Sequence, residues 1–233
     1  MSKELNVYRR EIKYVIPLSK VYIIKKSLDI ALSKDSHYNS KPYKIRSLYF
    51  DSINNRDFNE KLAGVENRRK YRLRIYGNNE SICKLEKKEK FGVLQQKQTL
   101  FLNKEEAIQC SKGDFSILRK YFDDSKFAVA TYNDLIKNCY KPVCIIDYDR
   151  CAYVHPLYDT RVTLDLSVKT NETNLALFSK TNDLFVQDDI AILEYKYSGE
   201  PVDYISQLIS SFGLEPSAYS KYCNGRLTYY FTF

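Results

Sequence analysis

Short stretches in which charged and apolar residues alternate recur along the chain. Successive side chains of a β-strand point to opposite faces, so a period of two predicts strands with one polar and one apolar face. Eight stretches show it, at residues 7–16, 44–51, 70–76, 82–90, 96–102, 142–154, 160–168 and 191–198. Most are joined by short connections, such as the turn expected at 77–79, which favours antiparallel pairing.

Apolar residues at helical spacing predict helices between these strands, at residues 19–32, 103–110, 116–121, 128–138 and 201–212. Ser19 and Asn103 are suited to cap the first two helices, and Pro201 suits the first turn of the last. No Gly-, Ser- or Pro-rich linker and no internal repeat divides the chain, so we expect one domain over residues 1–233. The expected class is α+β, an antiparallel sheet or barrel with inserted helices.

The charged faces of the predicted strands carry Arg and Lys with an occasional acid, whereas exposed strand faces also use Thr, Ser and Gln. Six strands contribute to this set: Glu11, Lys13, Lys70, Arg72, Arg74, Lys84, Glu86, Lys88, Tyr148, Arg150, Arg161, Asp165, Glu194 and Lys196. For any single strand, a sandwich with its charges facing water explains the pattern better. Taken together, the strands favour a closed eight-stranded barrel with the charges inside.

The chain has 233 residues, with 37 Lys and Arg against 29 Asp and Glu, a formal charge of +8. This excess predicts an anionic partner, either nucleic acid, a membrane surface or a small polyanion. Two histidines, and six cysteines without a C-x-x-C pair, argue against zinc sites and imidazole catalysis. No apolar run approaches the roughly 20 residues that cross a bilayer, and the charged N-terminus does not resemble a signal peptide. We therefore expect a cytoplasmic protein with reduced thiols.

Cations inside a barrel repel one another unless a ligand supplies the counter-charge. A triphosphate or polyphosphate does so, since Arg offers a rigid fork for phosphate oxygens and Lys a mobile point charge. The few inward carboxylates would then hold a divalent cation that bridges phosphate oxygens. RNA binding uses aromatic side chains within the basic face, whereas these tyrosines alternate away from the cations, so no nucleic-acid partner is expected.

Eight segments spread over nearly the whole chain resemble one known family. They are RREIKYVI (9–16), RSLYFD (46–51), YRLRIYG (71–77), KLEKKEK (84–90), YDRCAY (148–153), RVTLD (161–165), LEYKYSG (193–199) and SKY (220–222). In this order they are similar to the catalytic domain of the vacuolar transporter chaperone (VTC) polyphosphate polymerases, within the CYTH, or triphosphate tunnel metalloenzyme, superfamily. E-x-K alone has little specificity, but RVTLD followed by E-x-K and a terminal SKY is typical of the VTC branch.

The resemblance implies an antiparallel eight-stranded tunnel with packing helices. In that family the terminal phosphate of ATP passes to a growing polyphosphate chain, assisted by Mn²⁺ or Mg²⁺. By motif position, the resemblance implies catalytic and phosphate-binding roles for Lys13, Arg72, Arg74, Lys88, Arg150, Arg161, Ser220 and Lys221. It implies that Glu194 binds the metal, with Asp165 beside it. Further substrate-binding candidates are Glu11, Arg46, Lys61, Lys84, Glu86, Tyr148 and Lys196.

Two positions depart from the pattern of some relatives, because Lys61 stands in place of Arg and Ala218 in place of Lys. For Lys87, Glu89 and Lys90 we favour a structural interpretation, in which these side chains face solvent on an edge strand and do not belong to the site. Phosphoryl transfer asks mainly for alignment and charge neutralisation, so the scarcity of histidine fits it.

Two alternatives stay open. One is a hydrolase of the same architecture that cleaves tripolyphosphate or a nucleoside triphosphate, and the other is a non-catalytic polyphosphate-binding protein. Hydrolytic relatives tend to be richer in tunnel carboxylates. The inward acidic set here is Glu11, Glu86, Asp165 and Glu194, which favours transfer. All three hypotheses predict a concentrated interior column of cations and a nearly balanced exterior.

Overall fold

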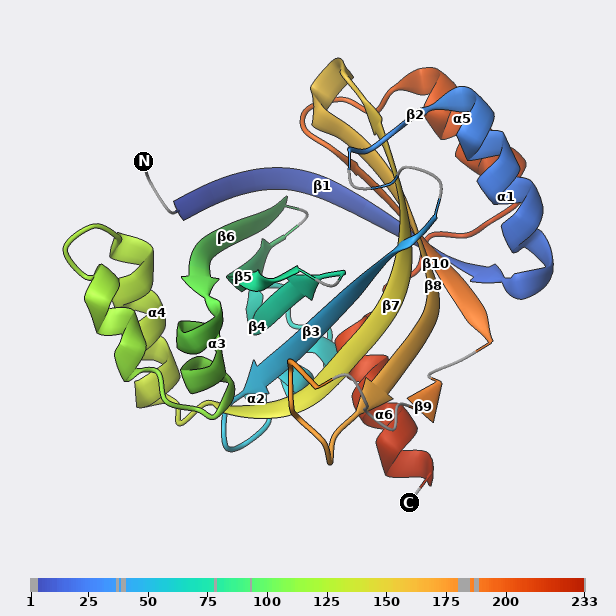
Figure 1. Ribbon diagram of the computed structural model, residues 1–233. Helices are drawn as coiled ribbons and strands as arrows, with labels where there is room; N and C mark the ends of the chain where they lie inside the picture. The colour runs from blue at the N-terminus through green and yellow to red at the C-terminus, as the bar shows by residue number, and fades with distance from the viewer. Residues whose placement is uncertain are drawn as a thin grey trace.

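The computed structural model describes residues 4–36, 38, 41–77, 79–92, 94–179, 185–186 and 189–232. Within these residues, eight antiparallel strands close into a barrel (Figure 1). Around the ring they are β7 (Lys141–His155), β3 (Tyr43–Asp51), β4 (Arg68–Tyr76), β5 (Asn79–Phe91), β6 (Leu94–Asn103), β1 (Glu4–Pro17), β10 (Ile190–Tyr197) and β8 (Thr160–Asn171). The barrel closes because β8 pairs with β7 over most of its length.

All eight predicted strands and their antiparallel pairing are confirmed. Two further strands of two residues each, β2 (Ser33–Lys34) and β9 (Phe185–Val186), pair with β7 and β8. They are too short to show an alternating pattern in the sequence. The turn expected at 77–79 falls where β4 leads into β5, with residue 78 outside the described residues.

The helices are α1 (Leu18–Ala31), α2 (Arg56–Leu62), α3 (Lys104–Ser111), α4 (Lys126–Lys137), α5 (Asp203–Ser211) and α6 (Lys221–Thr232), with 3₁₀ segments η1 (Ser116–Tyr121) and η2 (Leu157–Asp159). The sequence predicts α1, α3, η1, α4 and α5 but not α2 or α6. Asn103 caps α3 as predicted, because its side chain accepts the Glu106 N–H at 2.9 Å. The cap predicted at Ser19 is wrong, since α1 begins at Leu18 and Pro17 makes no side-chain cap.

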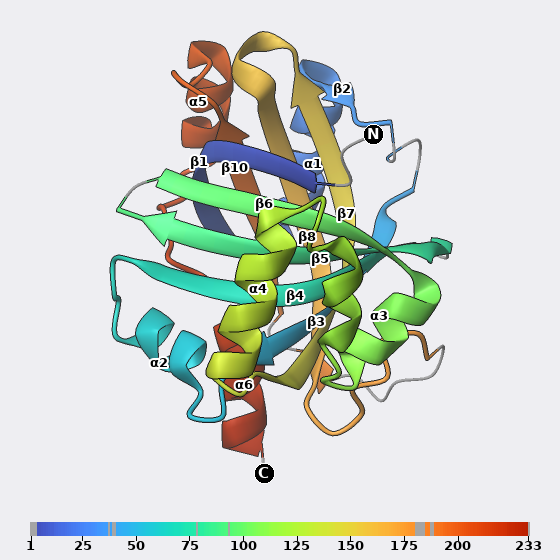
Figure 2. The same ribbon diagram turned by 90° about the vertical axis from the view of Figure 1, so that its left-hand side faces the viewer.

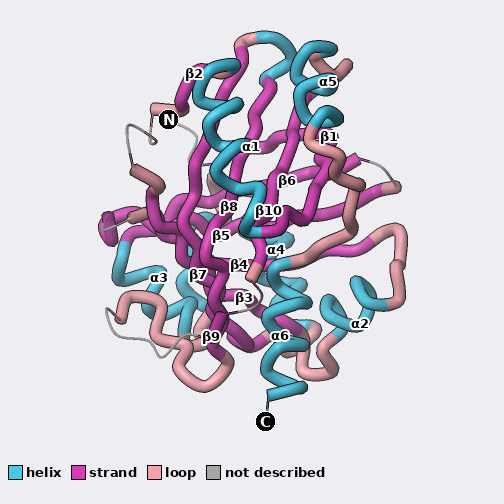
Figure 3. Tube along the Cα trace, turned by 90° about the vertical axis from the view of Figure 1, so that its right-hand side faces the viewer, coloured by secondary structure: helices cyan, strands magenta, loops and turns pink. Residues whose placement is uncertain are grey.

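Helices cover the apolar outer faces of the strands. α1 and α5 lie side by side on one flank and bury Ile24, Leu28 and Ile205 against β7, β8 and β10 (Figures 1 and 3). α3, α4 and η1 cover β3 to β6 on another flank (Figure 2). Burial of each such side chain contributes about 1.5–3 kcal/mol. On β4, β5, β8 and β10 the apolar face looks outward, so the charged face of the same strand looks into the barrel.

α6 packs against β7 and β8 near one end of the barrel and directs its first residues inward. Tyr222 stacks on Tyr49 of β3, with ring centroids 5.1 Å apart, and its hydroxyl donates to Asp51 at 2.5 Å. Asp51 also accepts the backbone N–H groups of Asp57 and Phe58 at the start of α2. One buried carboxylate therefore ties α2 and α6 to the end of β3. None of the helices within the described residues is both long and apolar enough to cross a membrane.

Candidate functional site

The barrel encloses a cavity of about 250 Å³, and a second cavity of about 670 Å³ lies at one mouth. The two share five lining residues, namely Glu11, Lys13, Lys70, Lys88 and Gln95, so they adjoin each other. Eleven cationic side chains line the inner cavity: Arg9, Lys13, Lys70, Arg72, Arg74, Lys88, Lys97, Arg150, Arg161, Lys196 and Lys221. Its lining includes two carboxylates, Glu11 and Glu194. Such a surface binds an anion of high charge density.

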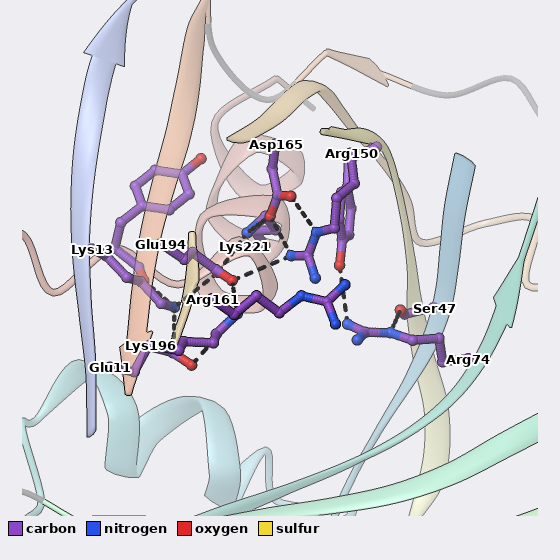
Figure 4. Close-up of polar contacts among 12 residues, drawn as sticks. Glu11, Lys13, Ser47, Arg74, Arg150, Arg161, Asp165, Glu194, Lys196 and Lys221 are labelled. Carbon is purple, nitrogen blue, oxygen red and sulfur yellow. Dashed lines mark hydrogen bonds and ion pairs between the residues drawn. The ribbon is translucent and has the colours of Figure 1, made fainter. Parts of the chain in front are cut away.

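Four charged side chains from β7, β8, β10 and α6 meet on one wall (Figure 4). Arg150 holds Asp165 through two parallel hydrogen bonds, at 2.6 and 2.7 Å, and its Nη2 also lies 3.2 Å from Glu194 Oε2. Lys221 Nζ lies 2.6 Å from Asp165 Oδ2 and 2.9 Å from Glu194 Oε1. Ser220 caps α6, with its Oγ accepting the Cys223 N–H at 3.4 Å, which holds the lysine at the start of the helix. The cluster fixes two cations in place at the cavity wall.

The charges of this cluster stabilise one another. Burial alone would raise the pKa of Glu194, but Lys196, Lys221 and other cations outweigh it and lower that pKa well below its ordinary value. Burial lowers the pKa of Lys221, yet Asp165 and Glu194 raise it above the ordinary lysine value. Both groups are therefore ionised at neutral pH.

A second cluster lies on β4 and β5, around the fully buried Glu86. Arg72 Nε donates to Glu86 Oε2 at 2.7 Å, and Arg74 Nη1 lies 3.6 Å from the same oxygen. Tyrosine hydroxyls hold the outer nitrogens, Tyr49 for Arg72 at 2.9 Å and Tyr148 for Arg74 at 3.0 Å. The two guanidinium groups are thus fixed toward the cavity before any ligand arrives.

A third cluster consists of Glu11 and the lysines that surround it. Its Oε2 accepts from Lys88 at 2.8 Å, and its Oε1 lies 3.5 Å from Lys13. Lys13 reaches Glu194 at 3.8 Å and also donates to the Tyr219 carbonyl at 3.0 Å. Lys196 bridges to Glu194 at 2.5 Å. Burial lowers the pKa of Lys196 to about 8, with Glu194 and Glu11 opposing that shift.

Most of the residues implicated by the sequence come together here. The inner cavity is lined by Glu11, Lys13, Arg72, Arg74, Lys88, Tyr148, Arg150, Arg161, Glu194, Lys196 and Lys221. Lys61 and Ser220 line the mouth cavity. Arg161 lies apart from the clusters, with Nη2 3.1 Å from the Tyr43 hydroxyl and 3.0 Å from Asp35.

Arg46 does not line either cavity, because its strand presents Ser47 and Tyr49 to the interior and Arg46 to the outside. Its guanidinium holds Asp147 at 2.7 Å and donates to the carbonyl of Leu177. This contact ties β3 and β7 to the segment after β8, so the structure does not support substrate binding by Arg46.

Three other candidates take places that differ from the expectation. Lys84 faces inward but lies over the rings of Tyr76 and Phe101, and it is not among the described residues that line either cavity. Glu86 and Asp165 are fully buried behind the arginines that they hold. In these places both carboxylates contact the cations of the wall rather than the cavity.

The sequence-based candidate set omits several cavity residues. Arg9, Lys70 and Lys97 line the inner cavity, and Lys90 and Glu89 line the mouth rather than a plain solvent face. The spacing places Lys70 on the charged face that it shares with Arg72, although the candidate set does not include it. Lys97 could not, because it stands among the glutamines of β6.

Some of the residues expected to bind a divalent cation can do so. Mg²⁺ and Mn²⁺ favour oxygen ligands, and Mg²⁺ is commonly held by one or two carboxylates with substrate phosphates and water. Glu194 and Glu11 face the cavity and can supply such oxygens. Within the described ranges, no group of three or more His, Cys, Asp or Glu side chains could hold a metal on its own. Asp165 does not fit, since it is fully buried and is not among the described residues that line either cavity.

Comparisons with known proteins agree with this geometry. The family model described as VTC domain matches residues 8–230. No curated protein matches. A candidate adenylate cyclase from Bacillus halodurans has a similar structure at 13% identity and a TM-score of 0.56, with 94% of this chain and 96% of that chain covered. A candidate adenylyl cyclase from Hippeastrum, described as revealing a dominant triphosphatase activity, shares 18% identity at a TM-score of 0.58, with 94% and 95% covered. At these identities the likeness shows the fold, and the expected barrel is confirmed.

Proposed function

Because the chain belongs to the VTC domain family, we propose that it is an ATP-dependent polyphosphate polymerase, which transfers the terminal phosphate of ATP to a growing polyphosphate chain. The observation that carries the proposal is the inner cavity, where eleven cations surround a space inside a closed barrel. Polyphosphate and the triphosphate of ATP share the repeating charge that such a wall neutralises.

The reaction requires alignment more than acid–base chemistry. A terminal oxygen of the acceptor chain attacks the γ-phosphorus of ATP, the bond from that phosphorus to the bridging oxygen breaks, and ADP leaves with the electron pair. Arg72, Arg74 and Arg150 each pair with a buried carboxylate, so their guanidinium groups are held at the cavity wall before the phosphates bind. Lys13 and Lys221 hold the donor and acceptor phosphates close in spite of their mutual repulsion.

Glu194, with Glu11 beside it, would hold the divalent cation of this site. When bound, Mn²⁺ or Mg²⁺ supplies positive charge to phosphate oxygens. The protein's own part is to keep both carboxylates ionised. Neighbouring lysines lower the pKa of Glu11 and of Glu194 in spite of burial.

The alternative is a triphosphatase, supported by the fold shared with the Hippeastrum protein and its described activity. A hydrolase needs room for a triphosphate and a water molecule. Here the cations continue from the inner cavity into the mouth, where Lys61, Arg68, Lys70 and Lys90 line the wall. A basic surface beyond the reacting phosphates suits a chain acceptor, and this favours the polymerase.

The test is incubation of the purified protein with ATP and Mn²⁺ or Mg²⁺. We expect long polyphosphate, seen by gel electrophoresis, together with ADP. Orthophosphate as the only phosphate product would identify a hydrolase and overturn the proposal. A Glu194→Gln variant separates catalysis from binding, since it should lose synthesis while it still binds tripolyphosphate. Tight polyphosphate binding without turnover of ATP would instead identify a binding protein.

A further inference from the structure

The cations around the two cavities differ in their counter-charges. Lys13, Lys88 and Lys221 each lie within 4.0 Å of a carboxylate. Lys70, which lines both cavities, makes no hydrogen bond or ion pair with any described residue. Its Nζ lies over the ring of Tyr49, 5.9 Å from the centroid. A lysine at the junction of the cavities therefore faces them without a partner among these residues.

Every element around Lys70 presents a cation or a neutral group to it. Lys88 lies directly across on β5, Lys13 faces it from β1, and Arg72 follows it on β4. The neutral groups are Tyr49 from β3 and the Cys223 thiol from α6.

The carboxylates of the same cavities have partners elsewhere. Glu11 holds Lys88 at 2.8 Å, and Glu89 holds Lys87 at 2.7 Å. Asp57 accepts from Tyr140 at 2.8 Å. Burial and the neighbouring cations lower the pKa of Lys70 well below the ordinary lysine value.

We propose that Lys70 is a phosphate-binding residue at the junction of the two cavities, and that it takes up a proton from solvent when a polyphosphate chain occupies the junction. The proposal rests on the proposed function and adds a subsite to it. A phosphate oxygen supplies both the missing hydrogen-bond acceptor and the missing negative charge. These favour the ammonium form, so the lysine gains a proton as the chain binds. Because the junction joins the inner cavity to the mouth, this contact serves a chain that spans both.

The test is isothermal titration calorimetry of the full chain with inorganic polyphosphate at pH 8, without ATP, in two buffers of different ionisation enthalpy. The dependence of the heat on the buffer counts the protons taken up. We expect Lys70→Met to bind polyphosphate about tenfold more weakly and to take up fewer protons than the wild type. Lys70→Arg should bind nearly as tightly as the wild type but show the lower proton uptake, since a guanidinium is already charged.

Lys44→Met is the matched control, because it removes a lysine whose side chain is 80% exposed on the outside of β3. It should match the wild type in affinity and in proton uptake. Far-UV circular dichroism verifies that each variant is folded.

Wild-type affinity in Lys70→Met would overturn the subsite, and wild-type proton uptake in Lys70→Arg would overturn the protonation. Since ATP is absent, both results are independent of catalysis. A protein that binds polyphosphate in this way but makes none from ATP would overturn the polymerase and leave the role of Lys70 standing.

Discussion

Lys221 is the cation that α6 contributes to the cavity wall, and its two carboxylate contacts come from different strands. Replacement by Met keeps most of the side-chain volume and removes the charge. We expect polyphosphate synthesis to fall by about 10²–10³-fold, the range seen when one preorganised electrostatic contact to a reacting group is lost. The measurement is kcat and KM for ATP. An unchanged kcat would place Lys221 outside the reaction.

Glu86 tests whether buried carboxylates position the arginines. It is fully buried, with Arg72 and Arg74 as partners and Lys97 at 3.3 Å. Glu86→Gln leaves two buried guanidinium groups without their counter-charge, so we expect a loss of about 3–5 kcal/mol in the free energy of unfolding. Urea denaturation measures this loss. Because phosphate can replace the carboxylate, tripolyphosphate should stabilise the variant more than it stabilises the wild type.

At the scale of elements, α2 and α6 both join the end of β3 through the buried Asp51, and Asp57 of α2 is its neighbour. Asp57 is buried next to Asp51, and burial first, then this neighbour, raises the pKa of Asp57 to about 8. The folded protein therefore holds a proton that the unfolded chain releases near pH 4, and stability falls as pH rises between these two values.

Asp57→Asn should abolish this pH-dependent loss. We expect the variant to be about 1–3 kcal/mol more stable than the wild type at pH 8.5, with little gain at pH 4. Urea unfolding at several pH values from 4 to 8.5 measures the difference. A gain that does not vary with pH would assign the effect to packing instead.

The strands could be predicted from the sequence because each has one charged and one apolar face, and that alternation survives in a single sequence. α6 could not, since its segment KYCNGRLTYYFT contains Gly, Asn and aromatic residues without a clear apolar stripe. α2 has seven residues, too few for a periodic signal. The same alternation explains the misplacement of Arg46, which was included by its motif although Ser47 and Tyr49 occupy the inward positions of β3. The partners of Glu86 and Asp165 depend on contacts between strands, which spacing along one strand does not reveal.

At the scale of the whole molecule, the charge excess is located inside. The inner cavity holds eleven of the 37 cations and two of the 29 acidic residues, which leaves 26 cations and 27 acids in the rest of the chain. The predicted interior column with a balanced exterior agrees with these numbers. The barrel therefore folds against the mutual repulsion of its own lining, and buried carboxylates offset only part of it.

A protein with this charge distribution should gain stability from the anion that it is built to hold. Ligand at 100 times its dissociation constant stabilises the folded state by about 2.7 kcal/mol. For a chain of this size, each kcal/mol raises the melting temperature by about 2–4 °C. We therefore expect tripolyphosphate to raise Tm by roughly 5–10 °C in thermal unfolding. Sulfate at matched ionic strength screens the exterior equally but does not span the cavity, so it should raise Tm much less. Equal shifts with both anions would mean that general screening, rather than occupation of the barrel, relieves the repulsion.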